Sequence, residues 1–83
     1  MEKSIYTHDY QVLLRLLRDT REHAGVTQVE LAHRLDQTQS YVSKIECGDR
    51  RLDIVQLRTI LMALGASLGD FVARFEATLA ARP

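Results

Sequence analysis

The segment from Thr27 to Gly48 constrains the fold of this chain more than any other. Thr27 and Thr38 each precede a short stretch of helical periodicity, and threonine is a favoured residue at a helix N-terminus. Only the three residues 36–38 separate the first stretch from the second. Two short helices joined by so tight a turn must cross steeply, and the second then stands out from the protein body. The small side chain of Ala32 lets the two helices approach each other.

Helix signals recur on both sides of this segment, and no stretch alternates apolar and polar residues as a strand would. Thr27–Glu30 and Asp53–Gln56 have the pattern of a capping box, and Ser67 with Asp70 forms a similar cap. The expected helices run over His8–His23, from Gln28 to near Leu35, over Gln39–Cys47, from Ile54 to Gly65, and over 68–81. The expected fold class is therefore all-α, with residues 1–83 as one domain and a helix-turn-helix core at 27–47.

Apolar side chains at helical spacing mark the expected buried faces. In the first helix they are Tyr10, Leu13, Leu14 and Leu17. In the last helix they are Leu68, Phe71, Val72, Phe75 and Leu79. Gly25 lies just past the first helix, where a left-handed residue commonly ends a helix.

A specific pattern runs through the two central helices: T-Q-x-x-L-A-x-x-L, then Q-x-x-V-S-x-I-E-x-G. The residues that carry it are Arg21, Gly25, Thr27, Gln28, Leu31, Ala32, Leu35, Gln39, Val42–Glu46 and Gly48. From Leu14 to Phe71 the chain thus resembles the Cro/phage-repressor class of helix-turn-helix proteins, also called the Xre family. This resemblance implies a five-helix lambda-repressor-like domain.

Two positions depart from the pattern of that family. Asp36 stands where the turn usually has glycine, and Gln37 stands where an apolar residue is common. Aspartate tolerates the left-handed conformation better than most residues do. We therefore expect the turn to form and to be more solvated than usual.

The outward strip of the third helix holds the expected base contacts. Gln39, Ser40, Ser43 and Lys44 are spaced so that they share one face. The resemblance implies that this face enters the major groove of double-stranded DNA. Glutamine can pair with adenine, and lysine favours the acceptors of guanine.

The resemblance implies that side chains around this strip contact phosphates. They are Gln28, Tyr41, Arg50 and Arg51, and Tyr41 could instead contact a thymine methyl. Gln28 opens the second helix, whose N-terminus attracts anions, and the two arginines directly follow the third helix. The resemblance further implies an ion pair between Arg21 and Glu46 that holds the first helix to the third.

The formal net charge is zero, which is unusual for a nucleic-acid binder. Acids and bases also balance regionally, with four of each in residues 1–26, four of each in 27–52, and three of each in the remainder. A DNA-binding face must therefore arise from the local arrangement of charge.

Cys47 is the only cysteine, and the three histidines lack metal-ligand spacing. No catalytic set, phosphate loop, metal or cofactor is expected, so the chain is interpreted as a non-enzyme.

A homodimer is expected from the apolar stripe of the last helix. Leu68 and Phe71 suffice to close a domain of this family, so the stripe beyond them would be exposed in a monomer. The expected interface consists of Phe71, Val72, Phe75 and Leu79. In the alternative, the last two fold back onto Tyr10 and Leu14 of the first helix.

The favoured function is a sequence-specific transcriptional regulator that represses by binding a near-palindromic operator. In the alternative, the chain is an antitoxin or an accessory subunit of a toxin–antitoxin or restriction–modification system, with a protein partner besides its operator. The stretch from Met1 to Tyr10 lacks the apolar core of a signal peptide, and no apolar run is long enough to span a membrane. A cytoplasmic protein of bacterial or phage origin is therefore expected.

Overall fold

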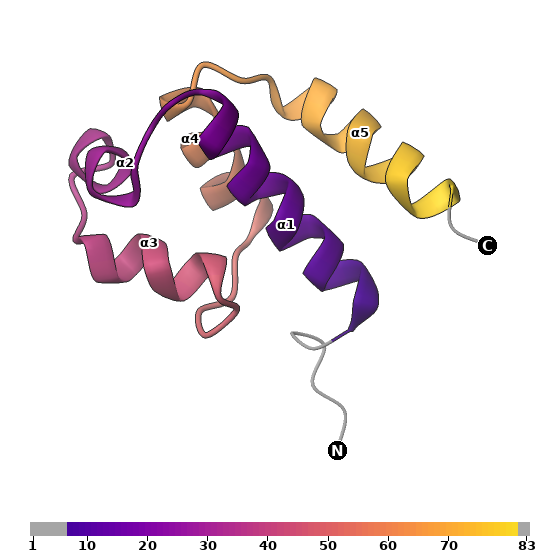
Figure 1. Ribbon diagram of the computed structural model, residues 1–83, viewed down its shortest axis with the longest axis horizontal. Coiled ribbons are helices and arrows are strands. Elements are labelled where there is room, and N and C mark those ends of the chain that lie inside the picture. Colours follow the sequence, from indigo (N-terminus) through magenta and orange to yellow (C-terminus); the bar gives the residue numbers. More distant parts are fainter. Residues whose placement is uncertain (1–6, 82–83) are drawn as a thin grey trace.

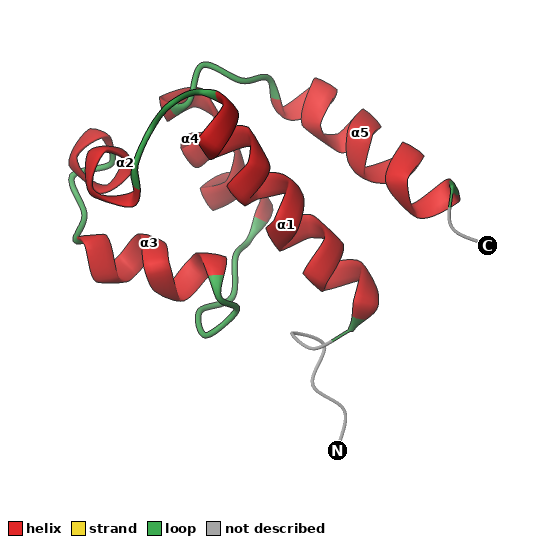
Figure 2. Ribbon diagram, in the orientation of Figure 1, coloured by secondary structure: helices red, strands yellow, loops and turns green. Residues whose placement is uncertain are grey.

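The computed structural model consists of helices joined by short loops (Figure 1). Each described helix follows a residue whose side chain accepts a hydrogen bond from the first turn of that helix. The structure describes residues 7–81, so most of the stretch interpreted as lacking a signal peptide lies outside the described residues. The helices are α1 (His8–His23), α2 (Gln28–Arg34), α3 (Gln39–Glu46), α4 (Ile54–Ala63) and α5 (Leu68–Ala80). Within the described range they are joined by loops alone, without strands (Figure 2). The predicted five-helix all-α fold is thus confirmed.

The predicted capping boxes form to different extents. At α4 both halves are present: the Gln56 N–H donates to Asp53 Oδ1 at 2.8 Å, and the Asp53 N–H donates to Gln56 Oε1 at 2.9 Å. At α2 only the Glu30 N–H bonds the Thr27 hydroxyl. The Glu30 carboxylate instead accepts from Arg34 Nε at 3.2 Å, so the second half of this predicted box is wrong. A charged partner one turn along the helix outcompetes the backbone N–H.

The turn between α2 and α3 confirms the expectation for its unusual residue. Asp36 adopts a left-handed conformation, with φ of 56°. The N–H of Gln37 donates to the carbonyl of Ala32 at 2.9 Å, and the Gln37 residue is exposed. The turn is therefore closed by backbone hydrogen bonding, and its missing apolar side chain leaves it solvated.

All five helices contribute to one apolar core. Its most deeply buried side chains are Leu17, Ile45 and Leu61, from α1, α3 and α4. On α1 the buried side chains also include Val12 and Leu16, whereas Tyr10 and Leu13 are only half-buried. The predicted face of α1 was therefore too narrow, because α3 and α5 pack against different sides of this helix (Figure 1).

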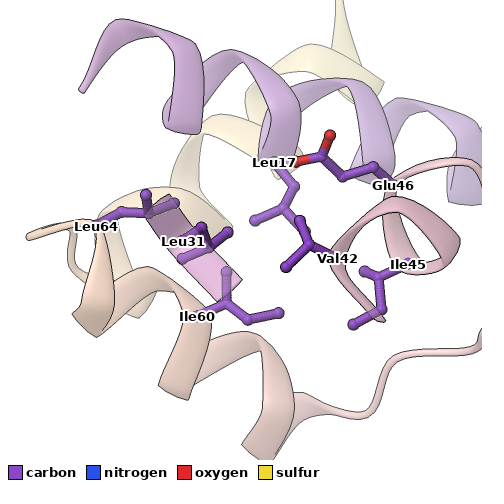
Figure 3. Close-up of a pocket in the computed structure, with 7 residues that line it drawn as sticks. All are labelled: Leu17, Leu31, Val42, Ile45, Glu46, Ile60 and Leu64. Carbon is purple, nitrogen blue, oxygen red and sulfur yellow. The ribbon is translucent and has the colours of Figure 1, made fainter. Parts of the chain in front are cut away.

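A small apolar pocket at the centre of the core shows how the helices meet. Its lining residues are Leu17, Leu31, Val42, Ile45, Glu46, Ile60 and Leu64 (Figure 3). The carboxylate of Glu46 reaches from α3 toward α1 beside these apolar side chains. This buried charge connects the fold to the candidate site.

The lengths of the helices also bear on membrane insertion. Among residues 7–81, no single helix combines the length and apolar composition needed to cross a membrane. Only α4 and α5 taken together meet that test, and a bend of 112° separates them.

Candidate nucleic-acid interface

The outer strip of α3 presents most of the side chains predicted to contact bases. Gln39, Ser40 and Lys44 are exposed, and Ser43 is half-buried. The Thr38 hydroxyl accepts from the N–H of Tyr41 and so fixes the start of α3. The structure therefore brings the predicted strip together on one surface, with Ser43 recessed.

Beneath this strip, Arg21 and Glu46 form the predicted ion pair. Arg21 Nε donates to Glu46 Oε2 at 2.6 Å, and Nη2 donates to Oε1 at 3.1 Å. The Arg21 Nη1 group donates to the carbonyl of Val26 at 2.8 Å. Both side chains are at most 10% exposed. The two-pronged geometry fixes the guanidinium plane, and with it the angle between α1 and α3.

The two glutamines predicted to contact DNA belong to the same hydrogen-bond network. Gln28 Nε2 donates to Glu46 Oε1 at 2.9 Å. Gln39 Nε2 in turn donates to Gln28 Oε1 at 2.7 Å. Both glutamines therefore have fixed amide orientations, which their positions in the sequence did not predict. We call Arg21, Glu46, Gln28 and Gln39 the polar network.

Hydrogen bonding controls the ionisation of Glu46. Burial opposes its charged form, but hydrogen bonds from Arg21 and Gln28 and the charges of Arg21 and Arg18 outweigh that effect. Together they hold the pKa of the Glu46 carboxyl below its usual value. The network thus retains its anion, and hence its geometry, at neutral pH.

The loop that links α3 to α4 places two arginines on tyrosine rings. The guanidinium carbon of Arg50 lies 4.9 Å from the ring centroid of Tyr41, on α3. That of Arg51 lies 5.2 Å from the ring centroid of Tyr10, on α1. The N–H of Arg50 also donates to the carbonyl of Lys44 at 3.0 Å. We call residues 48–53 the arginine loop.

Several contacts at this surface were missed from the sequence. Arg18 Nε lies 3.6 Å from Glu46 Oε1, and its position one turn before Arg21 on α1 was the available signal. Tyr10 was interpreted only as a core residue, yet its ring underlies Arg51. Tyr41 was predicted to contact phosphate, and the structure shows it half-buried beneath Arg50.

The reasoning that led to a dimer interface on α5 needs correction. Phe71 is 3% exposed and belongs to the core. Phe75 and Leu79 are half-buried and pack against the same core, because α5 lies along α1 (Figure 1). They are therefore not the surplus apolar surface that was expected. Of the four predicted interface residues, Val72 is the most exposed, at 37%.

Among residues 7–81, no group of three or more histidine, cysteine or acidic side chains is placed to hold a metal ion. Cys47, at the end of α3, is exposed and carries a free thiol. The groups predicted to contact DNA at this surface are amides, hydroxyls, guanidinium ions and the ammonium group of Lys44, all of which can bind bases or phosphates.

Comparison with known proteins matches the chain to one family model, described as a helix-turn-helix domain, over residues 12–75. Among solved structures, an XRE-family like protein from Pseudomonas syringae pv. tomato str. DC3000 is 41% identical, with a TM-score of 0.80 over 84% of this chain and 85% of that chain. The clp gene regulator ClgR from Corynebacterium glutamicum matches in two structures. One is 30% identical, with a TM-score of 0.75 over 89% of this chain and 79% of its own. The other is 29% identical, with a TM-score of 0.77 over 92% and 99%. No curated protein matches the sequence.

Proposed function

Because the chain belongs to the XRE family of helix-turn-helix DNA-binding transcriptional regulators, we propose that it represses transcription from a near-palindromic operator, which it binds as a homodimer. In this proposal α3 enters the major groove of double-stranded DNA, where every base pair presents a distinct pattern of donors and acceptors. Its outer strip reads the bases, and the residues around it hold the phosphates.

The observation that carries this proposal is the polar network under α3. Gln39 is an exposed amide whose Nε2 is already bonded to Gln28, so its orientation is set before any base arrives. Gln28 is in turn bonded to the buried Glu46. An amide held in advance loses less conformational entropy on binding, and only one of its orientations suits a given base.

Base and phosphate roles divide between two kinds of side chain in this proposal. Gln39, Ser40, Ser43 and Lys44 face the bases. Gln28, Tyr41, Arg50 and Arg51 surround them and serve the phosphates. With a net charge of zero, the protein depends on these close contacts more than on long-range attraction.

Selection from a pool of random duplexes tests the proposal directly. The expected result is an enriched motif with two related half-sites whose centres lie about 34 Å apart, one turn of the duplex. Binding of the selected duplex should exceed binding of its scrambled counterpart at a stated salt concentration. Recovery of no motif would contradict a role in sequence-specific regulation.

The proposed homodimer follows from the size of the recognition surface. One recognition helix reads only a few base pairs, and a two-fold pair doubles that information. On α5 the partly exposed Val72 is the member of the predicted interface best placed to meet a second copy. Exposed apolar side chains also occur at Ile54 and Val55, at the start of α4.

Light scattering with Val72→Glu tests the α5 interface, and Val55→Glu is its matched control. The expected result is a wild-type dimer, a monomeric Val72→Glu variant and an unchanged Val55→Glu variant. Phe75→Glu is less informative, because it places a charge against the core. A monomeric wild type would contradict the dimer, and a monomeric Val55→Glu with dimeric Val72→Glu would move the interface to α4.

A further inference from the structure

We propose that Tyr41 is a positioning residue for DNA binding, and that its ring holds the Arg50 guanidinium in place to grip a phosphate. This inference rests on the proposed function, and it changes the role of Tyr41 from a direct contact to a support. Its basis is the stacking of Arg50 over the Tyr41 ring, at 4.9 Å from the ring centroid.

The ring of Tyr41 is itself fixed by packing. It is half-buried, packs against the core, and lines a shallow groove with Leu35 and Val55. The backbone of the arginine loop is fixed as well, because the Arg50 N–H donates to the Lys44 carbonyl at 3.0 Å. A fixed ring and a fixed backbone leave the long Arg50 side chain as the flexible part of this unit.

Stacking restrains that side chain without occupying the groups that bind phosphate. A guanidinium ion offers a flat face to an aromatic ring and presents its N–H donors around the edge. A carboxylate would instead take those donors and cancel the charge. That is the state of Arg21, bonded to Glu46, and of Arg34, bonded to Glu30.

Arg50 differs from those two arginines. Among residues 7–81, no carboxylate lies within ion-pair distance of it, and its side chain is exposed. Its guanidinium is therefore not paired with a described carboxylate, is accessible, and is oriented by the ring. Those three properties together suit an incoming phosphate oxygen.

The neighbouring arginine repeats the arrangement on another helix. Arg51 stacks on Tyr10 of α1, at 5.2 Å from the ring centroid. The Tyr10 hydroxyl is buried and has no hydrogen-bond partner among the described residues, so the ring accounts for this contact. The two successive arginines of the loop thus stack on tyrosine rings that belong to two different helices, α3 and α1.

The test is a double-mutant cycle on Tyr41 and Arg50, measured with the full chain and a mixed-sequence duplex. Tyr41→Leu removes the ring, whereas Tyr41→Phe keeps the ring and removes only the hydroxyl. Arg50→Ala removes the partner. Arg58→Ala is the charge control, because Arg58 is an exposed arginine on α4.

Tyr41→Leu is expected to raise Kd about two- to fivefold, the range for an exposed cation–π contact. Tyr41→Phe and Arg58→Ala should match the wild type, and Tyr41→Leu should add no loss in the Arg50→Ala background. The slope of log affinity against log salt should fall in both Tyr41→Leu and Arg50→Ala, by at most about one ion. Circular dichroism checks folding, and Tyr41→Met replaces Tyr41→Leu if the latter loses its helical signal.

Two results would overturn the positioning role. Equal losses in Tyr41→Phe and Tyr41→Leu would show that the hydroxyl contacts DNA directly. A Tyr41→Leu loss that persists undiminished without Arg50 would show that the ring acts independently of this arginine. If the wild type bound neither the mixed-sequence duplex nor any selected one, the proposed function itself would fail. That result differs from the two above, in which the wild type still binds DNA.

Discussion

The polar network beneath α3 and the arginine loop after it both orient side chains toward the same surface, but by different physical means. The network is buried around Glu46 and consists of directional hydrogen bonds between 2.6 and 3.1 Å. In the arginine loop, Arg50 and Arg51 are exposed, and their guanidinium carbons lie 4.9 and 5.2 Å from the centroids of tyrosine rings. Buried hydrogen bonds fix angles but make the fold depend on them, whereas ring stacking orients a charge without that dependence.

This difference predicts which observable each region controls. Damage to the buried pair of the polar network, Arg21 and Glu46, should appear first in the free energy of unfolding, because a buried charge loses its partner. Damage to the arginine loop should appear in DNA affinity and its salt dependence, with the fold unchanged. The following variants test that division, beginning with the largest expected effect.

Arg21→Ala is expected to lower the free energy of unfolding by on the order of 3–5 kcal/mol, because it leaves Glu46 charged and buried. Urea unfolding measures the loss. In a double-mutant cycle, Glu46→Ala should cost much less in the Arg21→Ala background than in the wild type. Strict additivity would show that the two side chains are not coupled. The stability of the fold would then not depend on their ion pair, as it is not expected to depend on the arginine loop.

Acidification should lower the free energy of unfolding less than Arg21→Ala does, because a protonated Glu46 still accepts hydrogen bonds. The folded state lowers the pKa of Glu46, so the unfolded state binds its proton first as the pH falls. The stabilisation is therefore complete above the unfolded value of about 4.3 and is lost as the pH falls through the folded pKa.

Urea unfolding at a series of pH values measures this loss. Glu46→Gln is the matched variant, since glutamine keeps the shape without the titrating proton. Its stability should start lower at neutral pH and fall less on acidification. Parallel curves for the wild type and Glu46→Gln would assign the acid sensitivity to other carboxylates.

Gln39→Ala tests the point where the polar network reaches the surface. It should weaken binding to a selected operator by about 1–3 kcal/mol and relax preference at one or two base positions. Unfolding should change little, because Gln39 is exposed. Titrations on the operator and on scrambled DNA give the measurement. Equal weakening on both would show that Gln39 does not read bases.

Arg51→Ala, in the arginine loop, should have the smallest effect. It should weaken binding to all sequences similarly and flatten the slope of log affinity against log salt by about one ion. The unfolding midpoint should stay close to that of the wild type, in contrast to Arg21→Ala. An unchanged salt slope would count against a phosphate role for Arg51.

The features that could be predicted from the sequence were mainly local. Thr7, Thr27, Thr38, Asp53 and Ser67 each cap the helix expected to follow, because a cap depends on residues only three apart. The left-handed Asp36 was likewise predicted from the tolerance of one residue type. The pair Arg21–Glu46 spans 25 positions and came from family resemblance, since no local rule connects them.

The features that were missed depend on which helices meet in space. The apolar stripe on α5 indicated that Phe75 and Leu79 need a cover, and the cover by the first helix was predicted only as the alternative to a dimer interface. The same limit hid the stacking of Arg51 on Tyr10, which joins residues far apart in the chain. Competition between side chains also limited the predictions. The Glu30 carboxylate accepts a hydrogen bond from Arg34 and not, as the predicted capping box required, from the backbone N–H.

The packing of α5 along α1 has a consequence for how the protein is made. Residues of α1 leave the ribosome early, yet part of their apolar face is covered only when Leu68–Ala80 has been synthesised. Until then part of the core of the nascent chain is exposed, because Phe71 has not yet been synthesised. Exposed apolar surface of this kind is what chaperones bind and what favours aggregation during translation. Helix α5 is therefore the last of the described helices to join this core, and the speed at which it emerges sets how long the apolar face of α1 stays exposed.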